Sequence, residues 1–221
     1  MHSPCLIARV DSHRFAHQQN KDGRYKTITQ MKGEPIGDAL DYSFVGITAV
    51  EDMLSREPVS GCTKAMAAAS AVTGAASSSV PRGPTTCVRA PNNSITSIAT
   101  LPDVLEVLVE DKSKLFWLDL SCNAIADLGD ALEAFPGLRV LNLHGNSIST
   151  IADLKKICRL PLKSLTIHGN PVEAKKGIKN FLISSIPTLE KLNFCPITKQ
   201  DRAGAMTWRD IHIESRRRRD D

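Results

Sequence analysis

The sequence is poor in the features that define several large classes of protein. Its six cysteines include no C-x-x-C motif and no close pair, and aromatic residues make up only 5% of the chain. No apolar run approaches the roughly 20 residues that a transmembrane helix needs. The opening residues are polar again by Arg9, unlike a secretory signal peptide. We therefore expect a cytoplasmic protein, not attached to a membrane, whose thiols are reduced and mostly structural.

Motifs for catalysis are also missing. The sequence has no G-x-S-x-G nucleophile motif, no phosphate-binding loop and no glycine-rich dinucleotide fingerprint. Its net charge of +4 is concentrated near the ends, because basic residues outnumber acidic ones in residues 1–35 while residues 85–195 are nearly balanced. A nucleic-acid-binding protein normally carries its basic charge on the folded body. The sequence thus predicts no enzyme, no cofactor and no nucleic-acid partner.

What the sequence does contain is a repeat. The segments LFWLDLSCNAI, LRVLNLHGNSI and LKSLTIHGNPV begin at Leu115, Leu138 and Leu162, at intervals of 23 and 24 residues. Each fits LxxLxLxxNxI, the template of a leucine-rich repeat. A degenerate earlier copy begins at Thr85, and a fifth strand without the asparagine begins at Leu189. This period predicts an α/β solenoid of about five repeats, in which a curved parallel sheet is backed by convex helices and capped at both ends.

The segments outside the repeats are interpreted as caps, a linker and tails. Apolar residues at helical spacing (Ile47, Val50 and Leu54) predict an amphipathic helix that covers the first repeat. A second helix, opened by a capping-box-like sequence, would lay Trp208 and Ile211 over the last repeat. In chain order we expect a disordered basic tail (1–35), an N-terminal capping helix element (36–60), an Ala/Ser-rich linker (61–84), the repeats (85–197), a C-terminal cap helix (198–215) and a charged tail (216–221).

The repeat register places two rows of side chains on the concave face of the sheet, where solenoids bind partners. We expect Asp119 to form an exposed ion pair with Arg89 on the next strand. Phe116 and Trp117 are interpreted either as aromatic anchors for a partner or as residues covered by Tyr42 or Phe44. One row is Arg89, Asp119, Asn142, Thr166 and Asn193, and the other is Cys87, Trp117, Val140, Ser164 and Lys191. The candidate partner-binding residues are Phe116, Trp117, Asp119, Arg139, Asn142, His144, Lys163, Thr166 and His168.

Two further positions recur in the template. The asparagines are predicted to stack as a structural ladder whose amides satisfy backbone groups at each turn. His144 and His168 occupy one template position in adjacent repeats, and with Cys195 next in the row they could share a metal ion. A zinc site needs three or four ligands in tetrahedral array, whereas the row offers Ser121 on its other side. We favour a turn in which each histidine bonds locally, and we predict no metal. The predicted ladder is Asn93, Asn123, Asn146 and Asn170.

The repeats, the H-G-N turns and the closing ITKQDRAGAMTW resemble the short-repeat class of intracellular leucine-rich repeat proteins, typified by the protein phosphatase 1 regulatory subunit and U2A-prime. The closer resemblance, over roughly residues 38–210, is to the leucine-rich repeat-containing protein fifty-one family. It implies a cytoplasmic, non-enzymatic protein with a ciliary or flagellar connection. The motifs that carry it are LDYSF from Leu40, Val50-Glu51-Asp52, LHGNSI from Leu143, LTIHGNPVE from Leu165, and Thr198-Lys199 with Asp201, Arg202 and Trp208.

The combined hypothesis is an adaptor that binds a protein partner through its concave face. We expect it in the cytoplasm, at the ciliary or flagellar axoneme, as a monomer within a larger assembly whose candidate members are axonemal or tubulin-associated proteins. Two alternatives stay open. One is a regulatory subunit of a protein phosphatase, because a related short-repeat protein holds a catalytic subunit on its concave face. The other is an RNA-processing adaptor of the U2A-prime type, which the nearly neutral repeat body disfavours.

Overall fold

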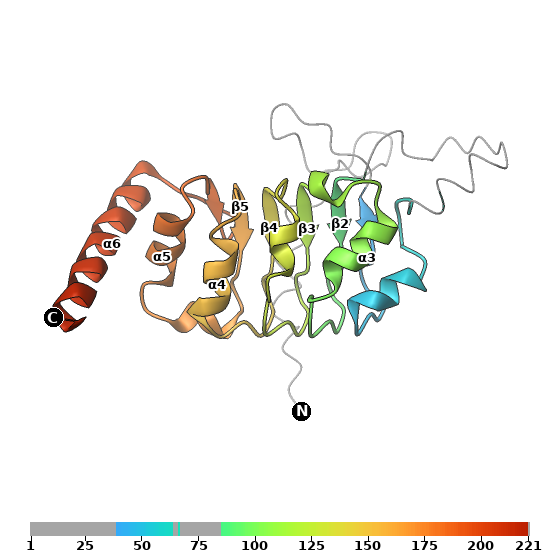
Figure 1. The fold of residues 1–221 in the computed structure, drawn as a ribbon, viewed down its shortest axis with the longest axis horizontal. Helices are drawn as coiled ribbons and strands as arrows, with labels where there is room; N and C mark the ends of the chain where they lie inside the picture. Colours follow the sequence, from blue (N-terminus) through green and yellow to red (C-terminus); the bar gives the residue numbers. More distant parts are fainter. Residues whose placement is uncertain (1–38, 64–65, 67–84, 221) are drawn as a thin grey trace. The chain divides into compact units, whose positions relative to one another are not determined.

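The computed structural model of the chain divides into two units, residues 1–36 and residues 37–221. It describes residues 39–63, 66 and 85–220 (Figure 1). The predicted basic tail (1–35) and most of the predicted linker (61–84) therefore lie outside the described residues. All described residues belong to the second unit.

The described residues form one sheet whose seven strands follow the order of the chain (Figure 1). The first six strands are parallel, and the last pairs antiparallel with its neighbour. One strand per repeat, each paired with the next, is the leucine-rich-repeat solenoid that the period predicts. The strands are β1 (Leu40–Asp41), β2 (Cys87–Arg89), β3 (Trp117–Asp119), β4 (Val140–Asn142), β5 (Ser164–Thr166), β6 (Lys191–Leu192) and β7 (Cys195–Pro196).

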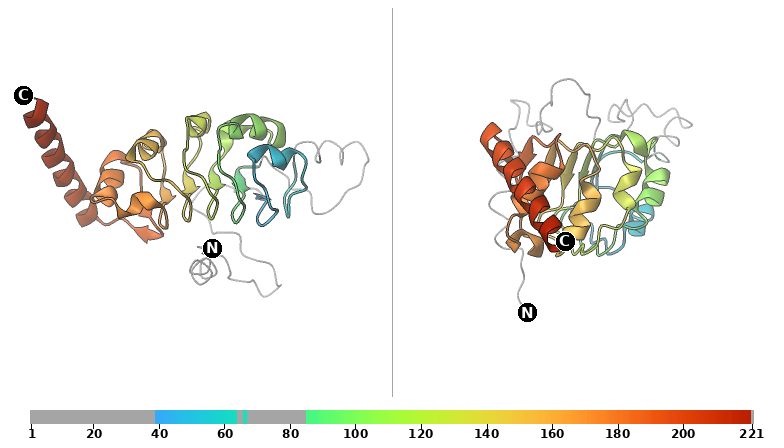
Figure 2. Two further views of the ribbon diagram at one scale, coloured as in Figure 1. Left: turned by 90° about the horizontal axis from the view of Figure 1, so that it is seen from below. Right: turned by 60° about the vertical axis from the view of Figure 1, so that its left-hand side comes forward.

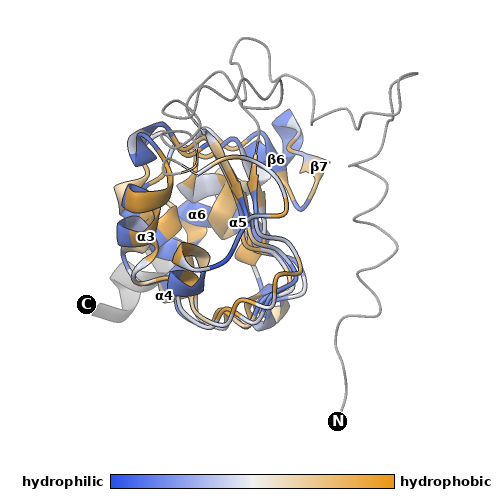
Figure 3. Ribbon diagram, turned by 90° about the vertical axis from the view of Figure 1, so that its right-hand side faces the viewer, coloured by the Kyte–Doolittle hydropathy of each residue, from blue (hydrophilic) through white to orange (hydrophobic). Residues whose placement is uncertain are grey.

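Helices return the chain between strands along one face of the sheet (Figure 2). The return over residues 127–135 contains only a single 3-10 turn rather than one of the convex helices expected from the repeats, because Gly129 has a φ of +52° and Pro136 follows. Figure 3 shows apolar and polar residues on the same helices, as expected for elements that bury one side. The elements are η2 (Val50–Leu54), α3 (Leu101–Leu108), η3 (Lys112–Lys114), η4 (Ala131–Ala134), α4 (Ile151–Ile157), η5 (Pro171–Ala174), α5 (Ile178–Ser185) and α6 (Lys199–Asp220).

The core lies between the sheet and these helices and is filled by the template residues. Leu118, Leu141 and Leu165 are paired across β3, β4 and β5 and are fully buried. Each such side chain contributes about 1.5–3 kcal/mol relative to an exposed one. Because the same leucine contact recurs in each repeat, the core is a continuous layer along the whole sheet.

The four template asparagines lie at the turn that follows each strand, and their amides bond the backbone of two successive repeats. In Asn146 the Oδ1 atom accepts from the Ile125 N–H at 3.0 Å. Its Nδ2 atom donates to the carbonyl of Leu120 in the preceding repeat and to that of Leu143 in its own, both at 3.0 Å. Asn93, Asn123 and Asn170 make the corresponding bonds.

The N-terminal element differs from the amphipathic helix expected over residues 36–60. Its first part is a strand, β1, and its helical part is only the 3-10 helix η2. Ile47 and Val50 are buried as predicted, but Leu54 is half exposed and Met53 is buried in its place. The segment is an additional repeat that lacks the asparagine, and Asn93 of the next repeat accepts from its turn just as the other ladder asparagines accept from the turn before them. The outer edge of β1 is closed by a return of the chain, in which Asp41 pairs antiparallel with Ser60.

The C-terminal cap is the helix α6, which packs against α5 and continues to Asp220, through part of the predicted charged tail. Thr198 and Asp201 form a capping box: the Asp201 N–H donates to Thr198 Oγ1 at 3.0 Å, and the Thr198 N–H donates to the Asp201 carboxylate at 3.0 Å. Ala205 is buried and Trp208 half-buried, but Ile211 is 56% exposed and does not cover the last repeat. The reason is that the helix extends past the end of α5.

Candidate functional site on the concave face

The concave face is the face of the sheet turned away from the helices. The strand register aligns Arg89, Asp119, Asn142 and Thr166 in one row across β2 to β5, with Asp41 of β1 at its start. A second row holds Cys87, Trp117, Val140, Ser164 and Lys191. The rows agree with those predicted from the sequence except at Asn193, because the repeat interval fixes which residues face each other on neighbouring strands. Asn193 was predicted to end the first row, but β6 stops at Leu192, and Asn193 has a φ of +50° and accepts from the backbone N–H groups of Ile167 and His168.

The centre of the first row is a buried chain of hydrogen bonds. The Asp119 carboxylate accepts from the Ser121 hydroxyl at 2.6 Å and from Asn142 Nδ2 at 3.1 Å. The Thr166 hydroxyl donates to Asn142 Oδ1 at 3.4 Å and lies 3.0 Å from His144 Nδ1. Asp119, Asn142 and Thr166 are all buried. They hold one another in place, so they shape the face rather than offering free polar groups to a partner.

The expected ion pair between Arg89 and Asp119 is absent from the part of the chain that the structure describes. Arg89 instead pairs with Asp41, with 3.0 Å between Nη1 and the carboxylate oxygen. The cause is the additional strand β1, which places a second carboxylate beside Arg89, while Asp119 is occupied by Asn142 and Ser121. The guanidinium carbon of Arg89 also lies 5.9 Å from the ring centre of Trp117.

The aromatic residues of β3 are less accessible than outward positions predict. Trp117 is 7% exposed and Phe116 is also buried. Phe44, one of the two residues expected to cover them, is 77% exposed. Tyr42, the other, is buried, and its hydroxyl donates to the Met53 carbonyl at 3.1 Å. Burial of this kind also raises the pKa of the neighbouring Cys87 thiol to about 12. The N-terminal half of the face is therefore closed around Trp117 in the structure.

The accessible part of the face lies over β4 to β6. Val140 and Ser164 are half-buried and Lys191 is exposed. Arg139 and Lys163, one residue before these strands, are partly exposed, and Lys163 lies 3.7 Å from Glu190 in a loose ion pair. Arg139 donates to the carbonyls of Pro136 and Leu138 at 3.1 Å, which fixes its guanidinium at this edge. Of the predicted partner-binding residues, Arg139, Lys163, His144 and His168 are the ones that reach solvent.

His144 and His168 form a parallel stack at the turns that follow β4 and β5. Their ring centres are 4.6 Å apart and their planes differ by 6°. Phe194 meets both rings edge-on, at 5.7 and 5.6 Å. Burial lowers the pKa of His144 below 6.5; the Asp119 carboxylate opposes this shift and the nearby His168 adds to it. The sequence did not predict this position of Phe194, because Phe194 occupies a template leucine position, which normally faces the core. Its backbone φ of +64° turns the side chain out of the core.

The stack does not have the geometry of a metal site. In-plane lone pairs of two parallel rings run side by side and do not converge on one ion. Cys195, the third candidate ligand, is exposed on the antiparallel strand β7 rather than continuing the histidine row. Within the described ranges, no group of three or more histidine, cysteine or acidic side chains is close enough to hold a metal.

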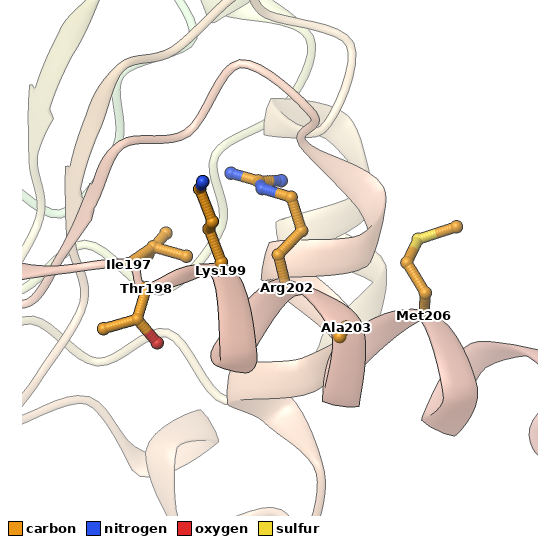
Figure 4. Close-up of a pocket in the computed structure, with 6 residues that line it drawn as sticks. All are labelled: Ile197, Thr198, Lys199, Arg202, Ala203 and Met206. Carbon is orange, nitrogen blue, oxygen red and sulfur yellow. The ribbon is translucent and has the colours of Figure 1, made fainter.

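A shallow groove lies at the other side of the last repeat, where the chain enters α6 (Figure 4). Its volume is about 290 Å³. Arg202 on its wall donates to the carbonyl of Leu189 at 2.6 Å, so its guanidinium mainly stabilises the C-terminal cap. The groove is lined by Ile197, Thr198, Lys199, Arg202, Ala203 and Met206.

Among the described helices, including α6, none is both long and apolar enough to cross a membrane.

The family model and the sequence relatives of the chain agree with this architecture. The family model described as a leucine-rich repeat matches residues 93–213. Leucine-rich repeat-containing protein 51 from Bos taurus is 34% identical over 80% of this chain and 88% of its own length, and the Homo sapiens protein of that name is 31% identical over the same shares. Among solved structures, the Drosophila melanogaster SNF/U2A′ complex contains a similar chain, with 24% identity, a TM-score of 0.49, and coverage of 57% of this chain and 73% of the other. The chain therefore belongs to the leucine-rich repeat-containing protein 51 family.

Proposed function

We propose that this protein is a non-enzymatic adaptor that binds a protein partner through the accessible part of its concave face. The observation that carries the proposal is the distribution of burial. The side chains of the two rows are buried around Trp117. Over β4 to β6, in contrast, four side chains remain accessible: Arg139, Lys163, His144 and His168. An ordered sheet that presents fixed side chains at regular spacing suits recognition of another protein. The proposal moves the binding centre away from Trp117 and Asn142, which are buried.

The proposal includes a cellular location. We place the protein in the cytoplasm, at the ciliary or flagellar axoneme, as a monomer within a larger assembly that includes axonemal or tubulin-associated proteins. This part rests on the family resemblance of LDYSF, the H-G-N turns and the end cap. A fluorescently tagged full chain expressed in ciliated cells should localise along the axoneme, and uniform or nuclear fluorescence would refute the location.

Binding is tested with a double variant, Arg139→Ala with Lys163→Ala. Both side chains are partly exposed and lie outside the core, so the fold should be retained. If they are central to the interface, each truncation costs at least about 1 kcal/mol, and together they should weaken capture of partners from ciliated cells about thirtyfold or more. The matched control is Lys155→Ala with Lys175→Ala on the convex side, which should leave capture unchanged. Equal effects of the two pairs would refute a concave binding surface.

A further inference from the structure

The two rings of the histidine stack differ in the surroundings of their inner nitrogen atoms. His144 Nδ1 points inward, 3.0 Å from Thr166 Oγ1, and His168 Nδ1 is a buried atom without a hydrogen-bond partner among the described residues. Nε2 lies across the imidazole ring from Nδ1, so an inner Nδ1 atom directs the Nε2 atom of each ring away from the core. Neither Nε2 atom has a hydrogen bond to any other described residue.

The proton of His144 is placed by the hydrogen-bond chain. A carboxylate can only accept, so Asn142 turns Nδ2 toward Asp119 and Oδ1 toward Thr166. Thr166 then donates its hydroxyl proton to Asn142 Oδ1. Thr166 Oγ1 is left as an acceptor, and His144 Nδ1 must carry a proton to bond it. Because burial also lowers its pKa, His144 stays neutral near pH 7 and its Nε2 atom carries a lone pair.

His168 has the opposite arrangement. Its Nδ1 atom is buried and has no acceptor in the part of the chain that the structure describes. A proton on that atom would be a donor without a partner, which is the costlier kind of unsatisfied group. The proton is therefore better placed on Nε2, where it reaches solvent. Adjacent rings at the same template position thus present an acceptor (His144) next to a donor (His168).

We propose that this acceptor–donor pair binds the backbone of an extended segment of the partner, with one residue donating its N–H to His144 Nε2 and accepting from His168 Nε2 through its C=O. This rests on the proposed function, since it names the partner chemistry of the same face. In an extended strand the N–H and C=O of one residue point to the same side, which matches the pair. A carboxylate or phosphate would need two donors and does not match it. Phe194, 41% exposed and edge-on to both rings, gives the adjacent partner side chain an apolar contact.

The tautomers are tested first, by long-range proton–nitrogen NMR on full-length protein labelled at histidine. At pH 7.5 we expect the proton of His144 on Nδ1 and that of His168 on Nε2. Thr166→Val removes the acceptor and should move the His144 proton to Nε2, while Thr166→Ser, which keeps the hydroxyl, should not. Thermal melting shows whether each variant is folded. One and the same tautomer in both histidines of the unaltered protein would overturn the proposal.

Binding is then tested with a defined probe. N-acetylalanine N′-methylamide offers the N–H and C=O of one extended residue, and its proline counterpart lacks that N–H. The alanine compound should shift the Nε2 resonances of both histidines, whereas the proline compound should shift His168 alone and bind about threefold more weakly or worse. Equal effects of the two compounds, or shifts of both histidines by acetate, would overturn the proposal. Loss of partner capture in the Arg139/Lys163 variant alongside such a failure would leave the proposed function standing.

Discussion

Replacing Asn146 with alanine should lower the free energy of unfolding by roughly 2–6 kcal/mol, although no apolar contact of the core is removed. Asn146 is buried, and its amide makes three hydrogen bonds of 3.0 Å that join two repeats, besides a longer contact of 3.5 Å with the His144 carbonyl. Alanine cannot replace any of them. Because each repeat is stabilised mainly by its neighbours, a bond that links two repeats affects the whole solenoid.

The magnitude follows from what each partner loses. The Leu120 carbonyl still accepts from Asn123 at 3.0 Å, and the Leu143 carbonyl still accepts from Asn170 at 2.8 Å. Those two losses therefore cost about 0.5–1.5 kcal/mol each, as for ordinary hydrogen bonds. The Ile125 N–H has no other acceptor among the described residues and becomes an unsatisfied buried donor, at a cost of about 1–3 kcal/mol.

Urea unfolding followed by circular dichroism gives the comparison. The matched control is Asn180→Ala on α5, where no side-chain hydrogen bond is made within the described ranges and alanine favours the helix. The control should change stability by no more than about 0.5 kcal/mol. A loss below about 1 kcal/mol in Asn146→Ala would show that water replaces the amide, and the reasoning about the ladder would then be wrong.

Two further predictions concern the C-terminal cap. Gly177 has a φ of +82°, and a Cβ atom there would lie 2.8 Å from the Trp208 ring. Gly177→Ala should therefore destabilise the fold by about 1–3 kcal/mol, as measured by thermal melting. Gly204→Ala, inside α6 where a Cβ atom meets no neighbour, should instead stabilise the fold by up to about 1 kcal/mol. The pKa of Asp201 is lowered from 3.8, chiefly by the Lys179 ammonium 2.8 Å away and then by Thr198. Its carboxylate therefore stabilises the fold above pH 3.8, and that contribution is lost as the pH falls further. The stability difference between Asp201→Asn and the unaltered protein should shrink between pH 6 and pH 2, and a constant difference would contradict this.

The repeat period was sufficient to predict the sheet and its register, because a template that recurs at 23 and 24 residues fixes both the strand positions and the residues that face each other. It was insufficient where the template changes. In the first repeat Leu40, Tyr42 and Ile47 keep the apolar positions but the asparagine is missing, and Ile47, Val50 and Leu54 happen to fit a helical spacing. Short-range periodicity cannot distinguish these two cases over so few residues.

The candidate site was harder to predict than the fold, since exposure depends on neighbours that the template does not specify. Alternation of strand residues places Trp117 and Asn142 on the concave face, but their burial depends on what lies against them. The pairing of Arg89 depends on Asp41, which belongs to the unrecognised strand β1. The position of Phe194 depends on one left-handed backbone angle. None of these is a property of the residue type alone.

The two ends of the buried hydrogen-bond chain differ in a way that bears on recognition. At Asp119 the chain begins with a group that only accepts, and this fixes the direction of every later bond through Asn142 and Thr166 to His144. His144 is the first member of the chain with an atom at the accessible edge. A partner that forms a hydrogen bond with His144 therefore meets an atom whose donor or acceptor character is set three hydrogen bonds away, by Asp119 in the preceding repeat. Substituting buried Asp119 with asparagine, which can also donate, would remove that constraint without touching the accessible surface.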